Sequence, residues 1–190
     1  MLIFNIAAEP HEFEQIHRLN YRTFVEEIPQ HSPNASGRLV DRFHDENTYV
    51  ICLRDSQLLG MLALRTQRPF SLDAKVPDLD THLPPSRRIC EVRLLAIEPH
   101  HRKGRILAGL LGEVWRQTTE WGCDMAIISG TTRQARLYRH MGFVPFGPLV
   151  GTAGAYYQPM YVTRAVLGQA IRRLHGNHTD STRPSANTAD

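Results

Sequence analysis

The sequence predicts an α/β protein built on a central mixed sheet of six or seven strands flanked by helices. In the first half, the apolar runs 49–53 and 60–64 are separated by a short turn, which indicates an antiparallel hairpin. In the second half, strand-like and helix-like patterns alternate between residues 89 and 140. Such alternation is typical of parallel strands joined by a crossover helix. Both kinds of pairing in one sheet make it mixed.

The N-terminal half begins with a short strand in the first residues, followed by an amphipathic helix over Glu9–Ile28. The apolar residues of this helix recur at helical spacing and include Phe13, Ile16, Leu19, Phe24 and Val25. Prolines, an asparagine and a glycine between residues 29 and 37 break the periodicity. The hairpin follows, and its turn is expected at residues 54–56.

The C-terminal half contains the regular alternation of elements. The expected elements are a strand at Ile89–Ile97, a helix at Gly104–Trp121, a strand at Met125–Ile128, a helix at Thr131–His140, a strand at Tyr156–Val162 and a helix at Arg164–Leu174. A chain of 190 residues favours one domain, which we assign to residues 1–165. We expect a short helix and then a disordered tail or linker in residues 166–190, because large apolar residues are missing from residue 176 onward.

Composition narrows the function classes. A formal net charge of +3 is too small to indicate nucleic acid as the partner. Three cysteines without CxxC spacing suit buried free thiols in a reducing compartment. We expect a cytoplasmic protein, because no apolar run approaches the length of a membrane span. The oligomeric state is left open, a homodimer included.

The join between the strand ending at Ile97 and the helix beginning near Gly104 has a basic loop, residues 98–103. A helix start presents unsatisfied backbone N–H groups and the positive end of the helix dipole. A glycine there lets a phosphate approach the backbone closely. The join therefore indicates a diphosphate site, and the alternative is a solvated basic turn that binds nothing.

Residues 97–111 of this join resemble the acyl-CoA-binding motif of the GNAT superfamily, Gln or Arg, two residues, Gly, one residue, then Gly or Ala. Gly104 matches the first small position, whereas His101 and Ile106 depart from the pattern. The resemblance implies a GNAT fold that binds acetyl-CoA or a longer acyl-CoA. The residues that would bind this donor are Ala96, Ile97, His101, Arg102, Lys103, Gly104, Arg105, Ile106 and Thr131.

A second match lies downstream, where residues 137–143 resemble the superfamily's Leu-Tyr-x-x-x-Gly-Phe segment. In that family the tyrosine hydroxyl can protonate the departing thiolate, and the role transfers to Tyr138. The alternative is a tyrosine that packs its ring under the sheet. Thr131 stands where the family often has an asparagine, seven positions before the tyrosine.

Two further groups are expected to act on the reacting centre. Glu91 enters the strand before its apolar run, so its carboxylate is a candidate base for the attacking amine, directly or through water. The alternative is a structural glutamate paired with Arg93 or Arg65. A backbone N–H near Leu95 is the expected stabiliser of the tetrahedral oxyanion.

The first half is similar to the N-acyl homoserine lactone synthases and the related N-acyl amino acid synthases. The similarity rests on residues 21–27, 41–44, 68–72, 76–79 and 90–92. It implies acceptor binding by Arg22, Phe24 and Asp41, and the alternative for Arg22 and Asp41 is an ion pair. His44 and Leu94 stand where the lactone synthases have an aspartate and an arginine, which argues against use of S-adenosylmethionine.

Together these features predict an N-acyltransferase. It would move an acyl group from acyl-CoA, or from acyl carrier protein, to a small-molecule amine or amino acid by direct attack in a ternary complex, without a metal. The alternatives are a catalytically inactive GNAT module that senses acyl-CoA and a homoserine lactone synthase.

Overall fold

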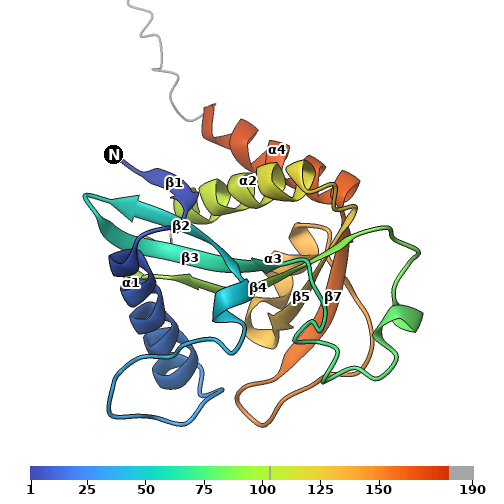
Figure 1. Cartoon of the computed structure of the whole chain (residues 1–190). Coiled ribbons are helices and arrows are strands. Elements are labelled where there is room, and N and C mark those ends of the chain that lie inside the picture. Colours follow the sequence, from blue (N-terminus) through green and yellow to red (C-terminus); the bar gives the residue numbers. More distant parts are fainter. Residues whose placement is uncertain (103, 180–190) are drawn as a thin grey trace, which may run out of the picture.

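One seven-stranded sheet organises the computed structural model, which describes residues 1–102 and 104–179, the last six of these by backbone alone (Figure 1). Its strand order is β1-β2-β3-β4-β5-β7-β6. The strands are β1 Ile3–Ile6, β2 Thr48–Arg54, β3 Gln57–Arg65, β4 Ile89–Ile97, β5 Met125–Thr131, β6 Val144–Pro145 and β7 Tyr157–Thr163. The predicted α/β class and the predicted number of strands are confirmed.

The sheet is mixed, as predicted. β1 to β4 pair antiparallel with their neighbours, β4 and β5 pair parallel, and β5, β7 and β6 pair antiparallel. Asp55 and Ser56 form the predicted turn of the β2–β3 hairpin, with φ of 51° and 62°. Two successive positive φ angles match the right-handed twist of a hairpin.

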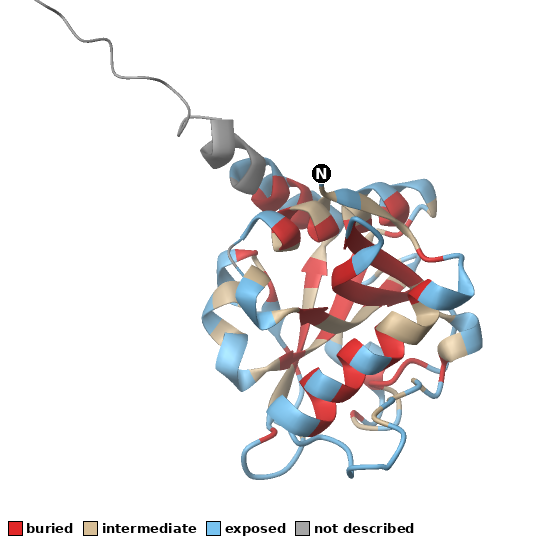
Figure 2. Ribbon diagram, turned by 90° about the vertical axis from the view of Figure 1, so that its left-hand side faces the viewer, coloured by how far each residue is buried: buried red, intermediate tan, exposed pale blue. Residues whose placement is uncertain are grey.

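Helices cover both faces of the sheet (Figure 1). α1 (Pro10–Tyr21), continued by a π-helical segment at Arg22–Glu27, packs on one face, and α2 (Arg105–Glu120) and α4 (Arg164–Thr179) cover the other. β2 shows the alternation that this requires: Ile51 packs with Ile16 of α1, whereas Val50 packs with Leu110 of α2. Figure 2 shows the buried strands between helices whose outer faces are exposed.

The predicted helix at residues 131–140 begins later than expected. β5 continues through Thr131, which pairs with Tyr157 of β7. A 3-10 turn at Thr132–Gln134 follows, and α3 spans Ala135–His140. Cross-strand pairing therefore extends the strand over a residue that the local pattern assigned to the helix.

The C-terminal helix is longer than predicted, since α4 runs to Thr179 and includes residues 176–179, which were assigned to the tail. Leu167, Ala170 and Ile171 are buried in a cluster with Leu111 of α2. The start of the segment 166–190 is thus part of the folded unit, and residues 180–190 lie outside the described part. No helix of the described residues is both long and apolar enough to cross a membrane.

The parallel strands β4 and β5 separate about halfway along their length. Their pairing covers only 89–92 with 125–128, after which β4 stays with β3 and β5 stays with β7. A bulge lies at the parting, where Leu94 and Leu95 together stand opposite Leu62, and Leu94 has φ of 55°. A bulge leaves its extra residue unpaired and bends the strand. The sheet is consequently split between β4 and β5.

Candidate active site

A cavity of about 500 Å³ crosses the sheet at this split. Side chains from both faces line it, so it joins the two sides of the sheet. On the face covered by α2 and α4, its wall is formed by Leu62, Val92, Leu95, Leu111, Val114, Ala126, Ile128, Tyr138, Met141, Phe143 and Leu167. Apart from the Tyr138 hydroxyl, these side chains are apolar. This apolar compartment suits a hydrocarbon chain.

On the opposite face the cavity wall is charged and polar. The charged compartment is lined by Asn20, Phe24, Gln30, His31, Leu39, Val40, Asp41, Arg42, Ser71, Ala74, Lys75, Arg93, Leu94, Ser129, Thr131 and Tyr157. Of the residues expected to bind the acceptor, Phe24 and Asp41 are present here. The two compartments therefore differ in the chemistry of the ligand that they can accept.

Tyr138 of α3 lies in the cavity wall, against β5. An added Cβ at Gly130 would come within 2.8 Å of the Tyr138 ring, so only a glycine on β5 leaves room for the ring in this position. Burial raises the pKa of Tyr138. The hydroxyl is therefore protonated at neutral pH and can donate a proton, as the predicted catalytic role requires.

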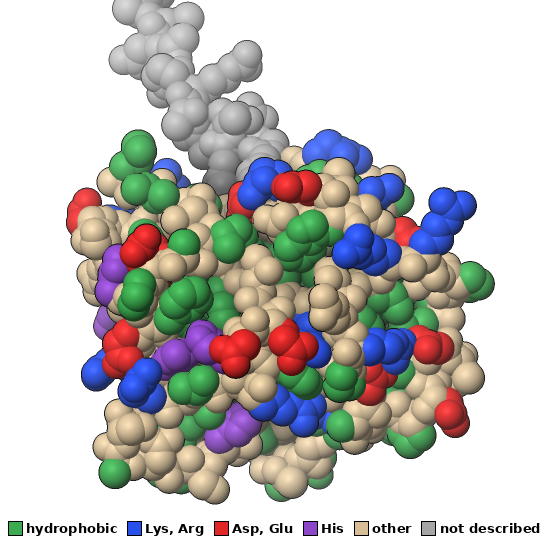
Figure 3. Space-filling view, viewed as in Figure 1, with side chains coloured by type: hydrophobic (Ala, Val, Ile, Leu, Met, Phe, Trp, Pro, Cys, Tyr) green, Lys and Arg blue, Asp and Glu red, His purple; other side chains and the backbone are tan. Residues whose placement is uncertain are grey.

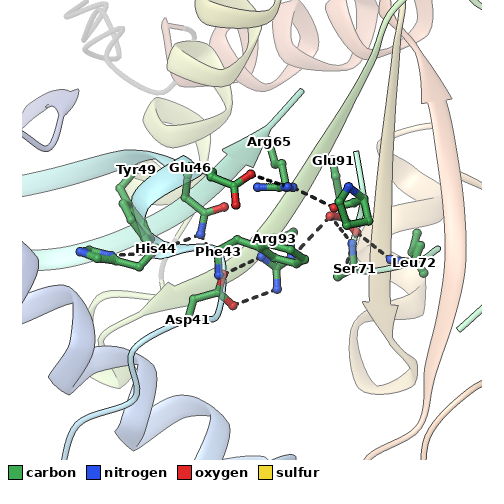
Figure 4. Close-up of polar contacts among 12 residues, drawn as sticks. Asp41, Phe43, His44, Glu46, Tyr49, Arg65, Ser71, Leu72, Glu91 and Arg93 are labelled. Carbon is green, nitrogen blue, oxygen red and sulfur yellow. Dashed lines mark hydrogen bonds and ion pairs between the residues drawn. The ribbon is translucent and has the colours of Figure 1, made fainter. Parts of the chain in front are cut away.

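Glu91 is fully buried and is not among the residues that line the cavity, and its carboxylate points toward Ser71 (Figure 4). Its carboxylate accepts hydrogen bonds from the Ser71 amide at 2.8 Å, the Ser71 hydroxyl at 2.5 Å and the Leu72 amide at 3.2 Å. The Arg93 Nε lies 3.6 Å away. Arg65 pairs instead with Glu46. The geometry favours the structural alternative for Glu91, because its oxygens are occupied by the 70–76 turn.

Asp41 lines the cavity and also forms the ion pair that the sequence left as its alternative. The two terminal guanidinium nitrogens of Arg93 donate to its carboxylate, at 2.8 and 2.9 Å (Figure 4), and the Asn47 side-chain amide donates at 2.9 Å. Burial opposes ionisation of Asp41, but the contacts with Arg93, together with the hydrogen bonds from Asn47 and the Phe43 amide, outweigh it and hold the pKa of Asp41 below its usual value. Asp41 is thus ionised and neutralises one cation of the compartment.

Arg22 lies outside the cavity, where it pairs with Glu98. Arg102 does the same with Glu27, both contacts being 2.6 Å. These two ion pairs link the π-helical segment to the loop between β4 and α2. Arg22 thus forms the ion pair that the sequence left as its alternative to acceptor binding, and Arg102, which was expected to bind the donor, also forms an ion pair.

The expected diphosphate site is an open turn at the start of α2. Gly104 has φ of 80°, and nothing lies within 4 Å of an added Cβ. His101 is half-buried and Arg105 is exposed beside it. The Ile106 side chain packs into the core against Gly60, so its departure from the small residue of the motif fills a space in the interior. Lys103 lies outside the described residues.

Ala96 and Ile97, at the end of β4, are buried on opposite faces of the sheet. Thr131 lies in the cavity wall, and its Oγ1 is buried without a hydrogen-bond partner. The same is true of the Ser129 Oγ, one pleat earlier on β5. Buried hydroxyls are normally hydrogen-bonded. These two therefore mark positions where a bound ligand can supply the partner.

Sequence reasoning missed several cavity residues. Lys75 and His31 come from irregular segments, Ser129 from a strand identified by its apolar neighbours, and Asn20 from the polar interruption of a helix. Asn20 is fully buried, and both atoms of its side-chain amide are without a partner. The sequence signal that could have pointed to the cavity is a polar residue, Asn20, among the apolar positions of an amphipathic helix, because burying an amide without a partner is costly.

The family model of FeeM, an N-acyl amino acid synthase, matches residues 15–165. The chain belongs to this family. It is therefore an acyltransferase. The match begins within α1 and covers β2 to β7 together with α2 and α3, and it leaves out β1. The search of curated protein sequences found no match.

Solved structures share the fold of this family member. A CoA-dependent acyl-homoserine lactone synthase, BjaI, with S-adenosylmethionine and isopentyl-CoA has a TM-score of 0.72 at 23% identity, over 92% of this chain and 89% of that one. FeeM from uncultured soil microbes has a TM-score of 0.69 at 16% identity, over 93% and 98%. A putative N-acetyltransferase from Lactobacillus plantarum has a TM-score of 0.62 at 17% identity, over 85% of this chain and 97% of that one. These similarities support the GNAT-like fold.

Proposed function

We propose that this enzyme transfers an acyl group longer than acetyl from CoA or acyl carrier protein to the amine of an amino acid, by direct attack in a ternary complex. The observation that carries the proposal is the cavity through the split sheet, apolar on one side and charged on the other. An acyl chain and a zwitterionic acceptor need these two environments. The amino acid follows from the family to which the chain belongs.

The donor would enter along the split between β4 and β5. The first-turn amides of α2 and the open turn at Gly104 suit the diphosphate of CoA. The unpartnered hydroxyls of Ser129 and Thr131 can bond with the amides of the pantetheine arm. The acyl chain then occupies the apolar compartment under α2 and α4.

In the proposed reaction the amine nitrogen attacks the thioester carbonyl, so that a C–N bond forms and the C–S bond breaks. Tyr138 donates its proton to the leaving sulfur. The backbone N–H at the Leu95 bulge would donate a hydrogen bond to the carbonyl oxygen as it becomes negative. The attacking amine loses its proton to a water molecule, which can pass it on to Glu91, because the Glu91 carboxylate is outside the cavity wall.

The lactone synthase alternative is disfavoured by two residues. Leu94, at the arginine position of that resemblance, lines the cavity with an apolar side chain. His44, at the aspartate position, contacts His17 and Tyr49 and does not line the cavity.

A cytoplasmic location remains part of the proposal. The free cysteines Cys52, Cys90 and Cys123 are buried, which is compatible with a reducing compartment.

The test is an acylation assay with donors from acetyl-CoA to palmitoyl-CoA, each also as the acyl carrier protein thioester, against the standard amino acids. We expect thiol release that depends on the amino acid, together with an N-acyl amino acid in the mass spectrum. Absence of amine-dependent thiol release with every donor would contradict the proposal and support the sensing module. A lactone formed when S-adenosylmethionine is the acceptor would support the lactone synthase.

A further inference from the structure

Lys75 is a half-buried cation in the wall of the charged compartment. Its Nζ lies 4.6 Å from the centre of the Tyr157 ring, a cation–π contact that holds the ammonium over the cavity. Among the residues that the structure describes, no carboxylate forms an ion pair with it. Burial lowers the pKa of Lys75, which indicates that the ammonium has lost solvent without gaining a full counter-charge.

The charged compartment as a whole carries an excess of positive charge. Its wall contains the cations Arg42, Lys75 and Arg93 but the single acid Asp41. Asp41 and Arg93 neutralise each other through their bidentate contact. Arg42, which stacks on Phe43, has no ion pair within residues 1–102 and 104–179. Two cations are therefore left to attract an anionic group.

The backbone at Lys75 is fixed by hydrogen bonds and by buried neighbours. The Lys75 amide donates to the Leu72 carbonyl at 2.9 Å, closing a turn whose Ser71 and Leu72 amides bind the buried Glu91 carboxylate. Leu72 and Val76 are buried in a cluster with Ile127 of β5. The backbone position of Lys75 is thus fixed by hydrogen bonds and by packing in the core, as a binding residue requires.

We infer that Lys75 binds the carboxylate of the acceptor, with Arg42 as the second cation, and so selects amino acids over amines and amides. This inference rests on the proposed function. In an α-amino acid one carbon separates the carboxylate from the amine. Anchoring the carboxylate therefore also restricts where the nucleophile can lie, which is how binding energy becomes orientation.

The experiment compares each amino acid that is acylated with its own amide and its decarboxylated amine. For wild type we expect a KM for the acid about tenfold or more below that for the amide, as a charge-assisted hydrogen bond provides. Lys75→Met should raise the KM for the acid by about the same factor, with a smaller change in kcat. It should leave kcat/KM for the amide unchanged, and Lys75→Arg should keep the preference for the acid.

Arg136→Met is the matched control, because Arg136 is an exposed cation of α3 outside the cavity wall. The inference is overturned if Lys75→Met retains the preference for the acid, or loses acid and amide activity equally while its thermal midpoint is that of wild type. Calorimetric binding of the standard amino acids and their amides supplies a readout without turnover. A further outcome is a protein that acylates no amine in the assay and still binds amino acids more tightly than their amides. If Lys75→Met abolished that binding preference, Lys75 would remain a carboxylate site and the proposed function would be rejected.

Discussion

The two carboxylates near β4, Glu91 and Asp41, have different structural roles. Glu91 and Asp41 are both ionisable residues close to the cavity, yet Glu91 holds a turn and Asp41 holds Arg93 at the cavity wall. A buried carboxylate is tolerated when its oxygens are satisfied by several donors. The three donors around Glu91 meet this requirement. It follows that removing its charge affects stability before it affects chemistry.

Glu91→Gln should lower the free energy of unfolding by about 1–3 kcal/mol, because the amide nitrogen of glutamine faces the donors of Ser71 and Leu72 and leaves them unpaired. Urea unfolding measures this. The KM for the acceptor should rise as the turn that carries Lys75 loosens, while the pH dependence of kcat keeps its shape. Ser71→Ala, which removes only the hydroxyl donor, is the milder control. Wild-type stability with loss of the acidic limb of the pH profile would instead establish Glu91 as the base.

Tyr138→Phe should fold normally and bind donor, since the ring fills the same space beside Gly130. What is lost is a hydroxyl that can protonate the leaving sulfur. We expect a single-turnover rate about a hundredfold lower, the scale of general acid catalysis. The deficit should shrink with an activated thioester, whose leaving group needs no proton. A full single-turnover rate with the natural donor would make Tyr138 a packing residue.

Residue roles were the hardest feature to predict from sequence. The motif located Tyr138 because the residues around it are contiguous. The partners of Arg22 and Glu91 lie 76 and 20 positions away in the chain, and such contacts leave no local pattern. Lys75 sits in a proline-containing segment without periodicity, so nothing local distinguished it from a solvated lysine.

The elements that make the cavity are the diverging ends of β4 and β5 and the helices α2 and α4 above them. The apolar compartment is open because the strands separate after Val92 and Ile128, and α2 bridges the gap with Leu111 and Val114. Its depth should therefore set the length of acyl chain that the enzyme accepts.

Leu111→Phe should shift the preferred donor to a shorter acyl chain, because the added ring atoms occupy space that the chain would fill. The specificity constants for a series of saturated acyl donors measure this shift. Leu107→Phe is the control, since Leu107 lies one turn earlier on α2 and does not line the cavity. An unchanged chain-length profile in Leu111→Phe would place the acyl chain elsewhere.

Elements were more predictable than residue roles, for a physical reason. The hairpin and α2 have strong local periodicity and clear turn residues, and both lie where the pattern placed them. The helix predicted over Glu9–Ile28 is α-helical only at Pro10–Tyr21 and continues as a π-helix at Arg22–Glu27. The end of β5 was misassigned because Thr131 is held by pairing with Tyr157, a long-range contact. α4 was predicted too short because the polar composition after Leu174 hides its continuation.

At the scale of the whole molecule, acidic and basic side chains are interspersed on the face seen in Figure 3. Basic and acidic residues are also interspersed along the sequence, and they sum to a formal net charge of +3. The charged compartment contains the half-buried Lys75, which forms no ion pair with the described residues. The fold could be predicted from the order of local patterns, whereas the connection of two compartments through a split sheet required the three-dimensional arrangement.

The central claim is that one cavity holds the acyl chain on one side of the sheet and the acceptor on the other. A crystal structure with a thioether analogue of decanoyl-CoA, which binds but cannot transfer, tests it most directly. We predict that the alkyl chain contacts Leu111, Ala126 and Ile128 and that the sulfur lies within hydrogen-bonding distance of the Tyr138 hydroxyl. An alkyl chain outside the split between β4 and β5, or a sulfur remote from Tyr138, would contradict the account.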